Sequence, residues 1–151
     1  MTTTFDRTDV HPPRVAGLLL AAGGGRRLGG RPKALLTHRG RPLVEYAVGV
    51  LRAAGCEVVH VVLGASAGLV RERAELLGCV LVDNPEWGEG MGSSLRAGLA
   101  SLAADPRRVD AALVLLVDQP GIGGERGQPR AQRGPHPLAP LRVVHEHAPQ
   151  Q

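Results

Sequence analysis

The sequence predicts a three-layer α/β fold in which crossover helices cover both faces of a mainly parallel sheet. Three observations predict it. Apolar runs of strand length alternate with amphipathic stretches of helix length between residues 15 and 117. The first run, 15–21 (VAGLLLA), has no polar alternation, as expected of a strand buried on both faces. Aromatic residues make up only 2% of the chain, so the core must consist of Leu, Val and Ala, which favours aliphatic α/β packing.

The first crossover helix follows that strand after a glycine-rich loop. Pro42 starts it, at a position where the missing N–H costs nothing, and Gly55 stops it. Its apolar positions keep a 3.6-residue period and are Leu43, Val44, Ala47, Val50, Leu51 and Ala54. Residues 57–63 (EVVHVVL) form a second strand. Ser66 caps a second helix that runs through residue 77 and whose apolar face is Leu69, Val70, Ala74 and Leu77.

The second half of the domain repeats this alternation. Residues 79–82 form a short third strand, residues 83–90 (DNPEWGEG) a turn-rich loop, and residues 91–103 a helix with apolar spacing at Met91, Leu95, Leu99 and Leu102. A fourth strand, 111–117, runs straight into Asp118. Right-handed crossovers between such strands give a Rossmann-like sheet, whose ligands lie beyond the carboxyl ends of the strands. The glycine-rich loop and Asp118 both fall at that edge.

The two ends of the chain differ in composition from this domain, which we assign to residues 14–122. Residues 1–13 lack an apolar period and end in two prolines, so we expect a disordered leader. Residues 123–151 contain five prolines, four arginines and three histidines, and we expect this Pro/Arg/Gly-rich tail to be disordered. It would leave the sheet incomplete toward the C-terminus. The tail is either a linker or the product of a frameshift in a GC-rich gene, and the abrupt change in composition favours the frameshift.

The formal charge of +4 and the isoelectric point near 10 suit an anionic partner: a nucleic acid, a membrane surface or a phosphorylated small molecule. Nucleic acid is disfavoured because Phe5, Tyr46 and Trp87 are the only aromatic residues, so platforms for base stacking are lacking. The longest apolar run, 111–117, is too short for a membrane helix, and the N-terminus has no signal-peptide pattern. The two cysteines form no metal-binding pattern, and we interpret them as reduced core thiols of a cytoplasmic protein.

The glycine-rich loop, residues 20–33 (LAAGGGRRLGGRPK), is the most informative stretch. Successive glycines let backbone N–H groups turn toward one point and let a phosphate chain approach closely, which makes a cradle for an anion. Arg27 adds a planar bidentate donor and Lys33 a movable point charge, both suited to the phosphates of a nucleoside triphosphate. A dinucleotide fingerprint needs glycine where Leu28 stands, and a P-loop needs lysine directly after its second glycine, so both fail on spacing. The alternative is a flexible, solvated loop.

At three segments the sequence resembles the MobA-like NTP transferases, and within them the molybdenum cofactor cytidylyltransferases. The segments are LAAGGGRRLGGRPKALL at 20–36, NPEWGEGMGSSLRAGL at 84–99 and LVLLVDQPGI at 113–122. Their combination and order are far more specific than any one of them. The resemblance implies the Rossmann-like fold of the nucleotide-diphospho-sugar transferases. A GHP segment of those relatives is matched only faintly at 134–137, and we assign it no role.

The resemblance also implies a set of site residues. Arg27 and Lys33 would contact the phosphates of the triphosphate, and Asp118 would hold Mg²⁺, so that these three act in catalysis. The LAAG form of the first loop goes with cytidine, which implies CTP as the substrate. The residues that would hold the nucleotide are Leu20, Ala21, Ala22, Gly23, Gly24, Gly25, Lys33, Gly90, Ser93 and Ser94.

The implied reaction transfers CMP from CTP to the terminal phosphate of molybdopterin and releases pyrophosphate. The implied partners are CTP, the molybdopterin-type acceptor and a molybdenum hydroxylase or its chaperone, with no nucleic acid and no membrane. Two alternatives stay open. One is an inactive or truncated nucleotide-binding remnant, and the other is a nucleotidyltransferase that acts on a sugar phosphate or alcohol phosphate.

Several of these residues also have purely structural interpretations. Ser93 and Ser94 can cap the start of their helix, and Asp118 can simply end its strand. Trp87 is either a lid over the base or a packing plug for its own loop. We interpret His60, which lies within a strand, as a core or face residue and not as a catalyst.

Overall fold

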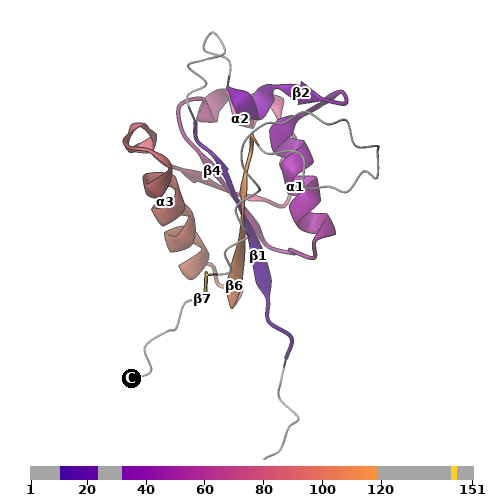
Figure 1. Cartoon of the computed structure of the whole chain (residues 1–151), viewed down its shortest axis with the longest axis vertical. Helices are drawn as coiled ribbons and strands as arrows, with labels where there is room; N and C mark the ends of the chain where they lie inside the picture. The colour runs from indigo at the N-terminus through magenta and orange to yellow at the C-terminus, as the bar shows by residue number, and fades with distance from the viewer. Residues whose placement is uncertain (1–10, 24–31, 119–143, 146–151) are drawn as a thin grey trace, which may run out of the picture.

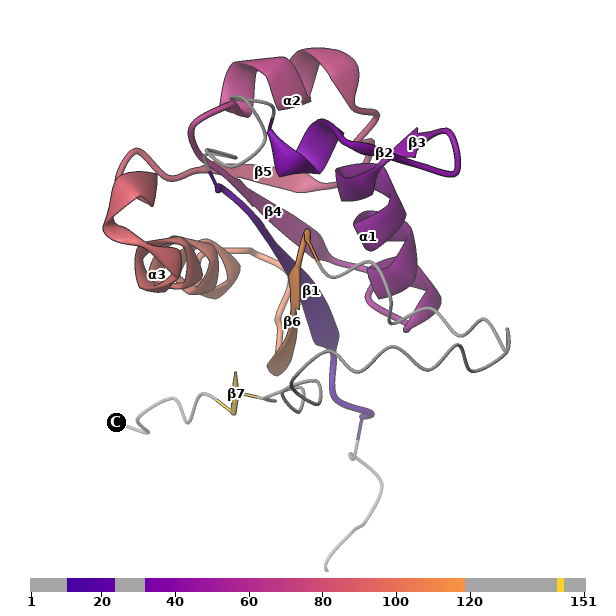
Figure 2. The same ribbon diagram turned by 45° about the horizontal axis from the view of Figure 1, so that its top comes forward.

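The computed structural model describes residues 11–23, 32–118 and 144–145. The strands of its main sheet are β1 (Val15–Ala21), β4 (Val59–Leu63), β5 (Val80–Asp83), β6 (Ala111–Leu116) and β7 (Val144–His145). They lie in the order β5-β4-β1-β6-β7, and all neighbours are parallel except β7, which is antiparallel to β6. Helices cover both faces of this sheet (Figures 1 and 2). The predicted three-layer, mainly parallel α/β fold is confirmed.

The side chains of the central strand β1 alternate between two cores. Leu19 and Ala21 pack on the face covered by α1 and α2, whereas Leu18 and Leu20 pack on the face covered by α3 (Figure 2). Because both faces are covered, every β1 residue after Val15 is buried, which explains the absence of polar alternation. The three helices are α1 (Leu43–Ala53), α2 (Ala67–Arg73) and α3 (Met91–Ala103).

The strand order creates a switch point between β1 and β6. From β1 the chain moves outward through α1 to β4 and through α2 to β5, and α3 then carries it back to β6 on the other side of β1. Right-handed crossovers in opposite directions put α1 and α2 on one face and α3 on the other. The ends of β1 and β6 run side by side, with Leu20 paired to Leu116. Loops that leave two such strand ends diverge, and the space between them is where open parallel sheets bind ligands.

A short hairpin precedes α1, and no sequence pattern predicted it. β2 (Thr37–His38) pairs antiparallel with β3 (Arg41–Pro42), just after the 3-10 helix η2 (Lys33–Leu35). The connecting residues Arg39 and Gly40 have φ values of 52° and 79°, and positive φ at both central residues is typical of a type I′ turn. Strands of two residues are too short to show alternation in a sequence.

The second helix is shorter than predicted. Ser66 precedes it without a side-chain capping bond, and it ends at Arg73 because Ala74 is extended, with φ −109° and ψ 140°. Leu69 and Leu77 were predicted on its apolar face but are 40% and 83% exposed. Ala74 packs against the core although it lies after the helix, whereas Leu77 belongs to the turn toward β5.

Other limits shift by one or two residues. The first helix begins at Leu43, because Pro42 still belongs to β3, and β4 begins at Val59. The last long strand, β6, ends at Leu116. Met91, the first residue in the predicted apolar spacing of α3, is 60% exposed and lines a cavity instead of the core.

Two residues of the tail form a strand where none was predicted. Val144 and His145 pair with Ala112 and Ala111 at the start of β6. An unpaired sheet edge presents N–H and C=O groups that any extended segment can join, so this pairing needs no periodic pattern.

Two smaller predictions concern the thiols and the membrane. Cys56 is buried and Cys79 half-buried, both are free, and burial raises the pKa of both thiols. In the described ranges, no helix is long and apolar enough to cross a membrane.

Candidate functional site

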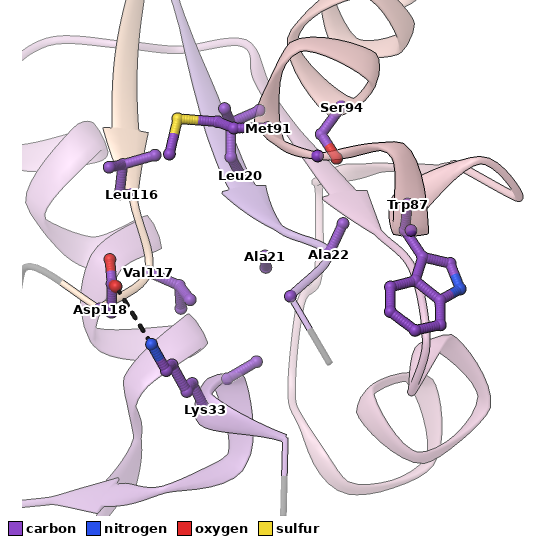
Figure 3. A pocket seen from close by; sticks show the side chains of 14 residues that line it. Leu20, Ala21, Ala22, Lys33, Trp87, Met91, Ser94, Leu116, Val117 and Asp118 are labelled. Carbon is purple, nitrogen blue, oxygen red and sulfur yellow. Dashed lines mark hydrogen bonds and ion pairs between the residues drawn. The ribbon is translucent and has the colours of Figure 1, made fainter. Parts of the chain in front are cut away.

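A cavity of about 450 Å³ opens at the switch point (Figure 3). Residues at the end of β1 lie in its middle, with Val117 and Asp118 on one side and Trp87 and Ser94 on the other. Segments far apart in the chain therefore meet in one place. The lining residues are Leu20, Ala21, Ala22, Gly23, Lys33, Ala34, Trp87, Gly88, Gly90, Met91, Ser94, Leu116, Val117 and Asp118.

One side of the cavity carries an ion pair. Lys33 Nζ lies 3.4 Å from Asp118 Oδ2, and the two side chains are 40% and 47% exposed, so both charged groups remain accessible to a ligand (Figure 3). Lys33 begins η2 after the glycine-rich loop, and Asp118 lies in the turn after β6, so the two loops at the switch point bring them together. Lys33 is also the only lysine in a chain rich in arginine. A flexible ammonium can follow a phosphate group in a way that a rigid guanidinium cannot.

The opposite side is formed by the turn into α3. Gly90 has φ 108° and ψ −178°, a conformation essentially restricted to glycine, and it joins the 3-10 helix η3 (Trp87–Glu89) to α3. A Cβ at this position would meet nothing within 4 Å, so the requirement for glycine is conformational and not steric. This glycine thus sets the direction in which α3 starts beside the cavity.

A buried polar cluster lies behind this wall, and no sequence pattern predicted it. Asn84 follows β5 and is only 4% exposed. Its Nδ2 donates to Ser93 Oγ at 2.9 Å and to Ser94 Oγ at 3.0 Å, while its Oδ1 accepts from the N–H of Glu86 at 3.0 Å. The N-cap position of α3 is occupied by Gly90, so neither serine stands at the capping position. The available signal was an Asn directly after a strand that ends at the ligand-binding edge.

Trp87 packs its own loop against the sheet. Its side chain is half-buried in the apolar cluster on the α3 face and also lines the cavity. A Cβ at Gly64 would lie 2.7 Å from Trp87 Cβ and 2.5 Å from the Ala22 carbonyl oxygen. The end of β4, the end of β1 and the Trp87 loop therefore meet with no spare space. These contacts are those of the packing plug, one of the two interpretations offered for Trp87.

The structure brings many of the predicted site residues to this one cavity. Those that line it are Leu20, Ala21, Ala22, Gly23, Lys33, Gly90, Ser94 and Asp118. Ser93 is buried behind the wall, where it contacts Asn84. Gly24, Gly25 and Arg27 lie outside the described residues. The lining residues not predicted are mostly apolar, and in a sequence they cannot be told from core residues.

His60 lies in a separate polar cluster under α3. It is 1% exposed, its Nδ1 is 2.7 Å from Ser101 Oγ, and its Nε2 is 2.8 Å from Asp105 Oδ2. Arg107 also bonds to Asp105 through its backbone and guanidinium groups. The bonds from Arg107, and then that from His60, hold the pKa of Asp105 well below its usual range. His60 is thus a core residue, as interpreted.

Asp118 is the cavity residue that offers a carboxylate. Across the described part of the chain, no group of three or more metal-binding side chains occurs. Mg²⁺ keeps several waters and binds through one or two carboxylates together with substrate phosphates. The partly exposed carboxylate of Asp118 beside Lys33 therefore fits a metal ion that arrives with a triphosphate.

A cavity at the switch point, lined by the end of β1 and by a lysine–carboxylate pair, defines an α/β domain with a candidate ligand site at the carboxyl edge of its sheet. The model of the MobA-like NTP transferase domain matches residues 17–138. This chain therefore belongs to the MobA-like NTP transferase family, as the sequence segments predicted.

Curated relatives carry different activities. Nicotine blue oxidoreductase from Paenarthrobacter nicotinovorans is 51% identical over 114 residues, covering 76% of this chain and 54% of the relative. Molybdenum cofactor guanylyltransferase from Cereibacter sphaeroides is 36% identical over 112 residues, covering 74% of this chain and 54% of the relative. The chain thus spans about half the length of the curated relatives it matches.

Solved structures of similar proteins share the fold. Rv0371c from Mycobacterium tuberculosis H37Rv matches with a TM-score of 0.61 and 34% identity over 72% of this chain and 53% of that protein. Its complex with manganese matches with a TM-score of 0.55 and 31% identity over the same shares of the two chains. The CTP:phosphocholine cytidylyltransferase of Streptococcus pneumoniae matches with a TM-score of 0.56 and 28% identity over 70% of this chain and 45% of that protein.

Proposed function

We propose that this chain binds CTP with Mg²⁺ in the switch-point cavity and transfers CMP to the phosphate of a molybdopterin-type acceptor. The observation that carries the proposal is the Lys33–Asp118 pair, which places a movable cation and a hard anionic ligand 3.4 Å apart at the switch-point cavity. A metal-bound triphosphate needs both charges at once, one for phosphate oxygens and one for the metal ion.

In this reaction an oxygen of the acceptor phosphate attacks the α-phosphorus of CTP. The new P–O bond joins CMP to the acceptor, and the bond between the α-phosphorus and its bridging oxygen breaks to release pyrophosphate. Lys33 would offset negative charge on the transferring and leaving phosphates, and Arg27 is assigned the same role by the family resemblance. Asp118 would hold Mg²⁺, which supplies further charge neutralisation when bound. The chain needs no nucleophile of its own.

The choice of CTP rests on the LAAG form of residues 20–23. Similarity to a CTP-dependent phosphocholine enzyme supports it, whereas a guanylyltransferase among the relatives keeps GTP as a competitor to be tested. The acceptor is less constrained, because that phosphocholine enzyme shows that sequences of this kind also serve an alcohol phosphate. A nucleotide-binding remnant without turnover is the remaining alternative.

A second candidate function is oxidoreduction. The observation that favours it is the 51% identity to a protein named nicotine blue oxidoreductase. A chain with that activity would bind a redox cofactor such as a nicotinamide dinucleotide, whose pyrophosphate also suits a glycine-rich loop. The loop lacks the spacing of the dinucleotide fingerprint, which is why nucleotidyl transfer is preferred.

Ligand-dependent stability distinguishes these functions. We would measure the thermal unfolding of the 151-residue chain with CTP, GTP, ATP or NADPH, each with and without Mg²⁺. At a ligand concentration of about 100 Kd, binding stabilises the folded chain by about 2.7 kcal/mol, which is easily measured. A Mg²⁺-dependent rise specific to CTP supports the proposal. A rise with NADPH alone supports the oxidoreductase, and a cooperative transition that no nucleotide shifts overturns both.

The single lysine permits a site-directed test without mutation. An amine-reactive reagent can modify only Lys33 and the terminal amine, and mass spectrometry separates the two. Bound CTP with Mg²⁺ should slow modification of Lys33 and leave the terminal amine unchanged. Equal rates at Lys33 with and without saturating nucleotide would place the triphosphate elsewhere.

A further inference from the structure

The orientation of the Asn84 amide is determined by a backbone group. The N–H of Glu86 can only donate, so the Asn84 atom that lies 3.0 Å from it must be the oxygen. The other terminal atom is then the NH₂ group, which faces Ser93 Oγ and Ser94 Oγ at 2.9 and 3.0 Å. Because an amide nitrogen only donates, both serine oxygens must accept, and each serine keeps its own hydrogen for another partner.

The two serine hydrogens have different destinations. Ser93 Oγ lies 2.9 Å from the carbonyl oxygen of Glu86 and 2.8 Å from that of Gly90, so its hydrogen is used within the loop. The Ser94 hydroxyl donates no hydrogen bond to residues 11–23, 32–118 and 144–145, although Ser94 is only 4% exposed and lines the cavity. A buried hydroxyl hydrogen beside a cavity is a donor for whatever occupies that cavity.

We infer that Asn84 is a positioning residue that fixes the Ser94 hydroxyl as a hydrogen-bond donor to an acceptor atom of the bound nucleotide. Without the amide, the Ser94 hydroxyl can turn back onto a carbonyl of its own helix, a common arrangement for helical serine. With the amide in place, the hydrogen bond from Asn84 holds Ser94 Oγ at the cavity, where its hydrogen makes no bond to the described residues. Ser93 then supports the loop, and the two serines predicted together as nucleotide-binding residues have different roles.

This inference rests on the proposed nucleotide site, and a comparison of single variants tests it. Dissociation constants for CTP with Mg²⁺ would be measured by titration calorimetry, with unfolding temperatures measured alongside. Ser94→Ala should raise the dissociation constant about tenfold, the loss of one hydrogen bond to a ligand, and should lower the unfolding temperature only by the loss of one hydrogen bond from Asn84. Ser93→Ala should lower the unfolding temperature more than Ser94→Ala does, but weaken binding less. Ser101→Ala, which removes a hydroxyl of α3 outside the cavity, should leave the dissociation constant unchanged.

A double-mutant cycle separates positioning from general loss of structure. In Asn84→Asp, a carboxylate faces both serines and reverses the direction of their hydrogen bonds, so binding should weaken by at least the tenfold seen for Ser94→Ala. Asn84→Ala serves the same purpose if the aspartate variant does not fold. If Asn84 acts through Ser94, adding either change to Ser94→Ala should cost less than threefold more.

The outcomes distinguish the two levels of inference. If the folded wild-type chain binds no nucleotide, the proposed function fails and the role of Asn84 falls with it. If wild type binds CTP but the Asn84 and Ser94 effects multiply, or Ser93→Ala weakens binding more than Ser94→Ala, only the positioning role is overturned. The positioning role is supported if the Asn84 and Ser94 changes together weaken binding by less than the product of their separate effects, and if Ser94→Ala weakens binding more than Ser93→Ala.

Discussion

Lys33 Nζ lies 3.4 Å from Asp118 Oδ2, although the two residues are 85 positions apart in the chain. The parallel pairing of β1 with β6 makes this contact possible, because it places the ends of two strands distant in sequence side by side. Both side chains are partly exposed, and ion pairs of that kind contribute only about 0–1 kcal/mol to stability. The pair therefore adds little to the stability of the fold, which is compatible with the ligand-binding role proposed for it.

We expect Lys33→Ala to weaken triphosphate binding far more than it weakens the fold. Loss of a hydrogen bond to a charged phosphate costs about 1.5–3 kcal/mol, roughly a tenfold to hundredfold rise in the dissociation constant, while the unfolding temperature should fall by only a few degrees at most. Calorimetric titration with CTP and Mg²⁺ measures the first effect and thermal unfolding the second. Arg73→Ala, which removes an exposed charge of α2, is the control and should leave binding unchanged. If Lys33→Ala and Arg73→Ala weaken CTP binding equally, Lys33 acts only through the net charge of the chain and not through a direct contact with the phosphates.

Asp118→Asn should make binding insensitive to the metal. The amide keeps the shape of the side chain but loses the charge that would hold Mg²⁺, so the wild-type gain in affinity on adding Mg²⁺ should shrink about tenfold or more. Binding of CTP would be compared with and without Mg²⁺ in both proteins. An unchanged dependence on Mg²⁺ would mean that the metal is held without Asp118.

The fold was largely predictable because strands that are buried on both faces of the sheet are continuous apolar runs in the sequence, and the helices that cover them have a helical period of apolar residues. The limits of β1 and α3 follow from an apolar run between Pro13 and the glycines and from a break at Asp105, and both are local signals. The sequence predicted that Lys33 and Asp118 lie at the same edge of the sheet. It did not predict the distance between their side chains, because that distance depends on packing. The Asn84 cluster and the β2–β3 hairpin had no such record, because short strands and single polar residues do not create a period.

The tight junction of β1, β4 and the Trp87 loop predicts a cost for Gly64→Ala. The added methyl would lie 2.5 Å from the Ala22 carbonyl oxygen, and backbone atoms there cannot move aside without shifting β1. We expect a loss of about 1–3 kcal/mol in the free energy of unfolding, together with weaker nucleotide binding. Chemical denaturation measures the loss. Gly49→Ala, on the open face of α1, meets nothing within 4 Å and should instead stabilise by about 0.5–1 kcal/mol.

Gly90→Ala tests the turn into α3. At φ 108° and ψ −178° an alanine is strained by about 1–3 kcal/mol, so either stability falls by that amount or the turn rearranges and the Ser94 wall of the cavity moves. Denaturation and CTP titration together separate these results. Gly92→Ala lies two residues further on in regular helix with only an ordinary contact to Arg96, and it should not destabilise. Comparable losses in both variants would contradict a special role for the turn.

The hydrogen bonds to Asp105 predict an acid-sensitive contribution to stability. Because Arg107 and His60 lower the pKa of Asp105 in the folded chain, its carboxylate stabilises the fold at pH values above its unfolded pKa of about 4. This contribution is lost as the pH falls through the lower, folded pKa. The unfolding temperature of wild type should therefore exceed that of Asp105→Asn most clearly above about pH 5, and the difference should narrow toward pH 3. Glu72→Gln, which changes an exposed carboxylate of α2, is the control, and its difference in unfolding temperature from wild type should not narrow in this way. If the difference in unfolding temperature between wild type and Asp105→Asn stays constant with pH, the bonds of Asp105 to Arg107 and His60 do not depend on its charge.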